Sequence, residues 1–117
     1  MMNMKIVVPV ARGRLCTHFG HCERFEVFEV DTASGTVVGI SSFEAPPHEP
    51  GLLPTLLAEK GVKVVIAGGM GSRAQELLRQ KGIEVRTGVS PEQGVPEELV
   101  RSYLSGSLIS GANVCDH

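Results

Sequence analysis

Four of the seven cysteine and histidine side chains lie in one seven-residue stretch near the start of the chain. The stretch reads Cys-Thr-His-Phe-Gly-His-Cys and contains four candidate ligands, which are Cys16, His18, His21 and Cys22. Thiolates and imidazoles bind iron–sulfur clusters, copper and zinc. A structural zinc site usually has two ligand pairs separated by a longer finger, and the spacing here differs from that pattern. The stretch therefore predicts metal chemistry.

Within this stretch, His18 is the strongest candidate ligand. It is followed by Phe19 and Gly20. An aromatic ring can pack beneath a loop, and glycine lets the backbone approach a ligand closely. The alternative is that Cys16 and Cys22 are small buried hydrophobic residues and that the histidines hydrogen-bond to loop carbonyls. Both interpretations stay open at the level of the sequence.

The end of the chain repeats the pairing of cysteine with histidine. Residues 113–117 form a tail that contains Cys115 and His117. A flexible segment of this kind could fold over a cluster bound by the first stretch, which makes both residues further candidate ligands. The alternative is an ordinary disordered chain end. The remaining histidine, His48, lies in a proline-rich linker and is expected to be a solvated residue.

A glycine-rich turn between a buried strand and a helix is a second candidate binding element. Its residues are Gly68, Gly69, Met70 and Gly71. A helix N-terminus presents unpaired N–H groups and a positive dipole end, so the turn could bind an anion such as the sulfides or carboxylate of a cluster. It matches neither the dinucleotide fingerprint nor the phosphate-binding loop. The alternative is a tight turn that needs glycine for packing, and Met70 is either a soft ligand or a packing residue.

Length and composition are typical of one globular domain, which we place at residues 1–117. The chain has 42% apolar and 21% charged residues and a net charge of -2. This balance argues against nucleic acid as a partner, and the longest apolar runs are far shorter than a membrane span. The N-terminus does not have the pattern of a signal peptide. We therefore expect a cytoplasmic protein whose cysteines stay reduced, which favours ligation or packing over disulfides.

The hydrophobic pattern predicts an α/β fold. Strands are expected where β-branched and aromatic residues cluster, and helices where leucines recur at helical spacing before a glycine. The later part alternates strand and helix, which implies parallel strands covered on both faces. Residues 11–23 are expected to form one long loop. The expected strands span 5–10, 24–31, 36–43, 63–67 and 83–86, and the expected helices span 52–60, 72–81 and a segment that begins near Ser90.

Several of these segments together resemble the nitrogenase iron–molybdenum cofactor accessory proteins, the NifX-like domain that also occurs at the end of NifB-type proteins. The His-Phe-Gly motif at positions 18–20 is the most specific element of the resemblance, which covers nearly the whole chain. The matching segments are Met4–Val10, His18–His21 with the strand at Phe25, Val64–Gly71 and Gly82–Val85.

The resemblance implies a ribonuclease-H-like, three-layer α/β/α fold with a five-stranded mixed sheet. It also implies a non-catalytic role in binding or carrying an iron–sulfur or molybdenum–iron–sulfur cluster, with proteins that donate or receive the cluster as partners. By the same resemblance, His18 corresponds to the loop histidine implicated in cofactor binding. Cys16, His21, Cys22 and the tail are additions to the pattern of the family.

Enzymatic functions find little support in the chain. Two-metal nuclease chemistry requires converging carboxylates, yet the strand at 5–10 contains none and Asp31 and Asp116 are the only aspartates. No serine, histidine and aspartate set occurs in a hydrolase motif. The second hypothesis beside the cluster carrier is a small interaction or regulatory domain that binds an anionic metabolite or partner at the turn from Gly68 to Gly71.

Overall fold

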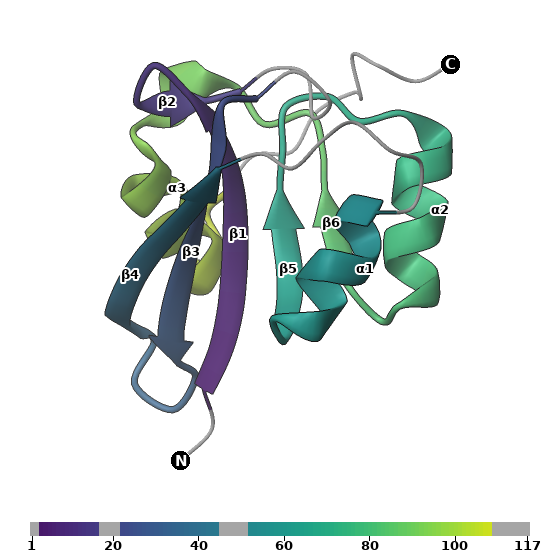
Figure 1. Ribbon diagram of the computed structural model, residues 1–117. Coiled ribbons are helices and arrows are strands. Elements are labelled where there is room, and N and C mark those ends of the chain that lie inside the picture. Colours follow the sequence, from purple (N-terminus) through teal and green to yellow (C-terminus); the bar gives the residue numbers. More distant parts are fainter. Residues whose placement is uncertain (1–2, 17–21, 45–51, 109–117) are drawn as a thin grey trace.

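The computed structural model describes residues 3–16, 22–44 and 52–108, which form an α/β fold (Figure 1). The strands are β1 (Asn3–Ala11), β2 (Arg14–Leu15), β3 (Arg24–Asp31), β4 (Thr36–Glu44), β5 (Val62–Ile66) and β6 (Glu84–Arg86). The helices are α1 (Leu52–Glu59), α2 (Ser72–Gln80) and α3 (Pro96–Ser105). None of the helices in these ranges is long and apolar enough to cross a membrane.

All the strands belong to one mixed sheet. Its order is β4-β3-β1-β5-β6, and the short β2 pairs with the end of β1. The neighbours β1, β5 and β6 run parallel, whereas β2, β3 and β4 join through antiparallel pairs. The expectation of a mixed sheet is therefore confirmed, but the expected five strands are wrong because the described part of the chain forms a sheet of six. The ribonuclease-H-like assignment stays a prediction.

The additional strand lies in residues 11–23, where the sequence predicts one long loop. Val10 pairs with Leu15, so only Arg12 and Gly13 form the turn between β1 and β2. Both residues have positive φ angles, 56° and 79°, as tight hairpin turns require, and glycine adopts such an angle without strain. A two-residue strand is too short to show a hydrophobic period, which is why the pattern did not reveal β2.

Two apolar clusters attach the helices to the two faces of the sheet. Successive strand residues point to opposite faces, so β1 and β3 contribute to both clusters. One cluster joins the sheet to α3, and the other joins it to α1 and α2. Members of the first include Ile6, Val8, Phe28 and Leu99, and members of the second include Val7, Phe25, Leu57 and Leu78. The expected three layers result, with α3 on the side of the sheet opposite α1 and α2 (Figure 1).

The third helix begins later than the expected start near Ser90. Residues Pro91–Gln93 form a short 3-10 turn, and α3 starts at Pro96, which occupies the first turn of the helix. Between them, Gly94 has a φ of 141°. Because a helix requires negative φ angles throughout, the chain cannot be helical from Ser90 onward.

Candidate metal centre

The segment with the candidate ligands is fixed at both ends to the carboxyl end of β1. The Cys16 N–H donates to the Pro9 carbonyl (2.8 Å), and the Glu23 N–H donates to the Val10 carbonyl (3.0 Å). Successive carbonyls of a strand point to opposite sides, so the chain leaves β1 on one side and returns on the other. Cys16 and Cys22 therefore stand where this segment begins and ends, over the end of β1.

The two cysteine side chains lie near each other. Cys16 is close enough to raise the pKa of the Cys22 thiol through charge repulsion and hydrogen bonding. Cys16 is 6% exposed, and Cys22 is half-buried and packs against the apolar cluster beneath α1 and α2. The sequence alone offered either ligation or packing for these residues. The structure brings the two sulfurs together at the edge of the core, where a soft metal ion could replace the thiol protons.

Burial raises the pKa of the Cys22 thiol from its ordinary value of 9.0 to about 12. Repulsion from the neighbouring Cys16 sulfur and the hydrogen bond between the two thiols add to the increase, and a hydrogen bond from the Cys22 backbone opposes it. The free protein therefore holds Cys22 as a neutral thiol at neutral pH. Because thiolates rather than thiols attack electrophiles and bind metals, Cys22 is a poor nucleophile at neutral pH, and a metal that binds it must displace its proton.

This pKa predicts how the stability of the metal-free protein depends on pH. The folded-state pKa of about 12 lies above the unfolded value near 9.0, so the folded state binds the proton more tightly. The resulting stabilisation is complete below about pH 9 and is lost as the pH rises towards about 12. We expect the urea midpoint to fall over this range by more in the wild type than in Cys22→Ser. Parallel pH profiles for the two proteins would contradict the assigned pKa.

The glycine-rich turn follows β5 and is anchored by backbone hydrogen bonds. The Gly68 carbonyl accepts the Gly88 N–H (2.7 Å), and the Ala67 N–H donates to the Arg86 carbonyl (2.8 Å). At the N-terminus of α2, Gly71 has an extended backbone, with φ −61° and ψ 150°. Among the described residues, no atom lies within 4 Å of a Cβ atom built at Gly71. Neither strain nor packing requires glycine there, so the packing alternative finds no support at this position.

Met70 has a different environment from Gly71. Its side chain is 1% exposed and belongs to the apolar cluster under α1 and α2, which Cys22 also contacts. The buried side chain of Gln75 donates to the Met70 carbonyl (2.9 Å) and so fixes the turn to α2. Packing accounts for this side chain, and a role for Met70 as a soft ligand stays a prediction.

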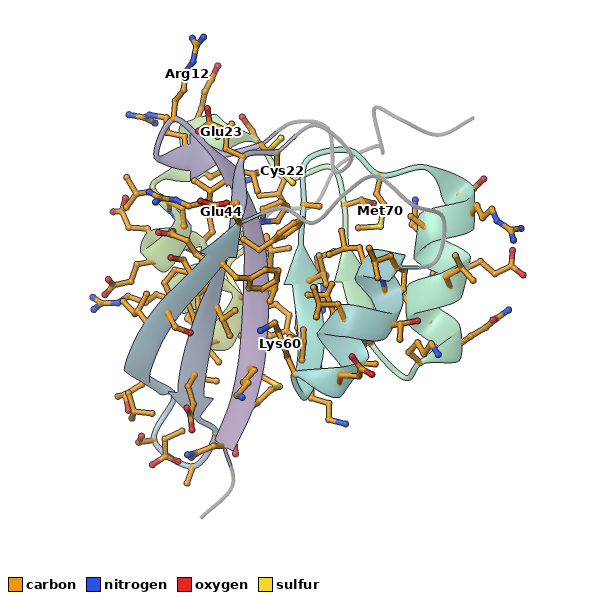
Figure 2. The ribbon with its side chains drawn as sticks, viewed as in Figure 1. Arg12, Cys22, Glu23, Glu44, Lys60 and Met70 are labelled. Carbon is orange, nitrogen blue, oxygen red and sulfur yellow. The ribbon has the colours of Figure 1, made fainter. Side chains whose placement is uncertain are left out.

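The thiol pair and the glycine-rich turn lie at the same edge of the sheet. β1 and β5 are parallel neighbours, so their carboxyl ends share an edge. Figure 2 shows Cys22 and Met70 at this edge, at the top of the view. Cys16, Cys22 and the turn at residues 68–71 therefore lie in one region of the fold. Open α/β sheets commonly place their binding sites at such an edge.

Several predicted site residues lie outside the described part of the chain. These are His18, Phe19, Gly20, His21, Cys115 and His117, and their roles stay predictions. Among residues 3–16, 22–44 and 52–108, no group of three or more histidine, cysteine or acidic side chains is positioned to hold a metal. The described ranges thus contribute two of the proposed ligands, Cys16 and Cys22.

Glu23 is a supporting residue that the sequence analysis did not identify. Its carboxylate accepts the N–H of Arg12 (2.9 Å) in the hairpin turn, so it joins the turn to the chain that returns after Cys22. Figure 2 shows Arg12 and Glu23 together above β1. The contact joins two residues that are 11 positions apart in the chain. No local sequence pattern predicts such a contact.

Comparison with known proteins places the chain in a family. The family model described as dinitrogenase iron-molybdenum cofactor matches residues 2–106. An uncharacterised protein of Methanocaldococcus jannaschii is 27% identical over 117 residues, with 90% of this chain and 89% of that protein covered.

Solved structures support the fold. The crystal structure of PH0822 has a TM-score of 0.81 and 27% identity, covering 92% of this chain and 94% of that one. The apo form of the orange protein from Desulfovibrio gigas has a TM-score of 0.69 and 22% identity, with 94% of each chain covered, and shows likeness of fold alone. With the family model matching most of its length, the chain belongs to the dinitrogenase iron-molybdenum cofactor family.

Proposed function

We propose that this protein binds or carries an iron–sulfur or molybdenum–iron–sulfur cluster as a non-catalytic accessory protein. Membership of the family supports a cofactor-associated role. The observation that carries the finer proposal is the proximity of the Cys16 and Cys22 thiols at the edge of the sheet. Two adjacent soft ligands beside a segment with two imidazoles suit a sulfide-rich metal cargo better than a hard cation.

The proposed ligand set combines described and undescribed residues. Cys16 and Cys22 supply thiolates after losing their protons, and His18 and His21 supply imidazoles from the segment between them. Phe19 and Gly20 shape the same segment. The backbone of Gly68, Gly69 and Gly71 faces the anionic cargo from the end of β5, and Met70 supports that turn from below. Cys115 and His117 complete the set if the tail closes over the cargo.

The proposed function also implies a cellular location and partner proteins. A cytoplasmic location keeps the thiols reduced and available as ligands. A carrier must receive its cargo from one protein and release it to another, so its partners are cluster donors and acceptors. The carrier role includes no bond-making step on a substrate, which is why we propose that the protein is not an enzyme.

A second candidate function rests on the open N-terminus of α2. Because a Cβ at Gly71 would meet no neighbouring atom of the described residues, the backbone there is open to a ligand. The chain could then be an interaction or regulatory domain that binds an anionic metabolite or partner at this turn. Such a domain would leave the thiols without a functional role.

Anaerobic reconstitution with iron and sulfide separates the two functions. A carrier acquires the visible absorption of thiolate-to-metal charge transfer and retains metal after gel filtration. Parallel loading with molybdate and sulfide, followed by metal analysis, identifies the preferred cargo. A colourless protein that retains neither iron nor molybdenum would overturn the carrier function and favour the regulatory domain.

The position of the site predicts different effects for two histidine variants. His18→Ala is expected to speed cluster loss under a competing chelator, because it removes an imidazole from the segment between the two thiols. His48→Ala, in the proline-rich linker, should retain the cluster as the wild type does. The decay of visible absorbance measures both. Equal losses in the two variants would show that the site is placed wrongly.

A further inference from the structure

The described residues expose three large apolar side chains, and two of them line one groove. Val38 is 57% exposed, Ile40 54% and Val95 43%. Ile40 and Val95 line a groove of about 230 Å³ between the sheet and the start of α3, and Val38 lies two residues before Ile40 on β4. Exposed apolar groups that gather at a concave site mark an interaction surface. This groove is on the α3 face, away from the cluster beneath α1 and α2.

The groove is lined by apolar and acidic residues and by Gly13 of the hairpin turn. Phe28, Ile40, Val95 and Pro96 supply its apolar surface, and its charged lining residues are Glu26 and Glu97. Glu97 also pairs with Arg101 at 2.5 Å, an exposed contact within α3. Further along the same face, Arg24 lies opposite Glu44 on the neighbouring strand. The three glutamates named here outnumber the two arginines, so this face carries one excess negative charge.

Beside the groove, β4 forms one edge of the sheet (Figure 1). The strand has nine residues, with no proline, no lysine and one charged residue, Glu44. Its register shifts at Val38, after which each residue from Gly39 to Glu44 pairs regularly with β3. Natural edge strands are usually short, charged or covered, because their free N–H and C=O groups can pair with another strand. The regular part of β4 therefore suits strand addition.

The register defines which side chains an added strand would present to the groove. Ile40 lies opposite Phe28, and Ser42 lies opposite Glu26, so these four side chains share the α3 face. Residues two apart on an added strand would also face this side. One of them would lie beside Ile40 and the next beside Ser42, close to Glu26.

We propose that the groove binds an extended segment of a protein partner, which adds as a strand along residues 39–44 of β4. The segment places an apolar side chain beside Ile40 and a lysine or arginine beside Ser42, from where the long side chain extends across β4 towards Glu26. Charge complementarity selects this occupant. A second copy of the chain would instead bring the same acidic groups towards each other. This surface is independent of the cluster, so the metal-free protein suffices to test it.

The test uses the full-length, metal-free protein and the peptide acetyl-Thr-Val-Thr-Lys-Thr-Val-Thr-Lys-amide, which carries valine and lysine on one face when extended. One control peptide replaces lysine by glutamate, and another moves each lysine next to valine, onto the opposite face. Amide chemical-shift titration is expected to show binding of the first peptide at residues 39–44 and at Val95 and Glu97. We expect it to bind about 10-fold more tightly than either control, a difference of about 1.4 kcal/mol.

Protein variants test the same contacts. Ile40→Lys, at an exposed position, should reduce peptide affinity at least about 10-fold, and Glu26→Gln should weaken it and flatten its dependence on salt. Glu76→Gln removes the same charge from an exposed position on α2 and should bind like the wild type. Thermal melts of each variant verify folding, and Glu26→Gln keeps the test valid if Ile40→Lys is destabilised.

Three results would overturn the proposal. The first is no binding of the lysine peptide, or binding equal to that of the glutamate peptide. The second is chemical-shift changes at residues away from β4 and α3. The third is a wild-type dimer by light scattering that Ile40→Lys converts to a monomer, because the edge would then be covered by a second copy of this chain.

Discussion

From the proposed carrier function, the double variant Cys16→Ser/Cys22→Ser is expected to retain a reconstituted iron–sulfur cluster at least about 100-fold less well than the wild type, because loss of a partner outside the ligand shell already costs up to that much. Serine preserves the size of the side chains but removes the soft ligands. The rate of absorbance decay under a competing chelator measures the loss. The two single variants should each fall between the wild type and the double variant.

Folding must be separated from ligation in this experiment. Cys16 is buried and Cys22 half-buried, so thermal melts of the metal-free variants are required alongside the decay rates. The matched control is Val27→Thr, which places a hydroxyl group in the same apolar cluster but changes no proposed ligand. If the folded double variant retained the cluster as the wild type does, the two thiols would be packing residues and not metal ligands.

Replacing Phe25 by alanine is expected to destabilise the fold by about 3–5 kcal/mol, the usual cost of removing a buried phenylalanine. Phe25 is 1% exposed, and its ring stacks on Phe43 with centroids 5.3 Å apart. The loss is a large part of the roughly 5–15 kcal/mol that holds a domain together. Urea unfolding at equilibrium measures it. Val38→Ala, at a side chain that is 57% exposed, should change stability by less than about 0.5 kcal/mol.

A smaller effect of Phe25→Ala, near that of Val38→Ala, would show that the cluster under α1 and α2 contributes little to stability. The cluster also contains Cys22 at its margin. Since burial is the main cause of the raised Cys22 pKa, water admitted by the alanine should lower that pKa. A titration of thiolate absorbance on the two proteins measures this second effect.

Most of the regular elements were predictable because their residues follow strong local rules. The strand at 24–31 has the predicted bounds, and the helix at 72–80 ends one residue earlier than expected. Alternation of aromatic and charged residues and the spacing of leucines before Gly82 each report a structure that forms within a short window. The predicted start of α3 was wrong because Pro91 and Pro96 both suit the first turn of a helix. Only the backbone at Gly94 distinguishes the two positions.

The sequence by itself determined the layered α/β order, the family resemblance and the grouping of soft ligands near positions 16–22, since all of these depend on residue type and spacing. Tertiary structure decided that β2 folds back on β1, that Cys16 and Cys22 lie close enough to interact, and that the groove beside β4 stays open. It also decided that the turn after β5 reaches the same edge as the thiol pair. These results depend on contacts between segments far apart in the chain or on burial, and neither quantity is encoded in any single window of residues.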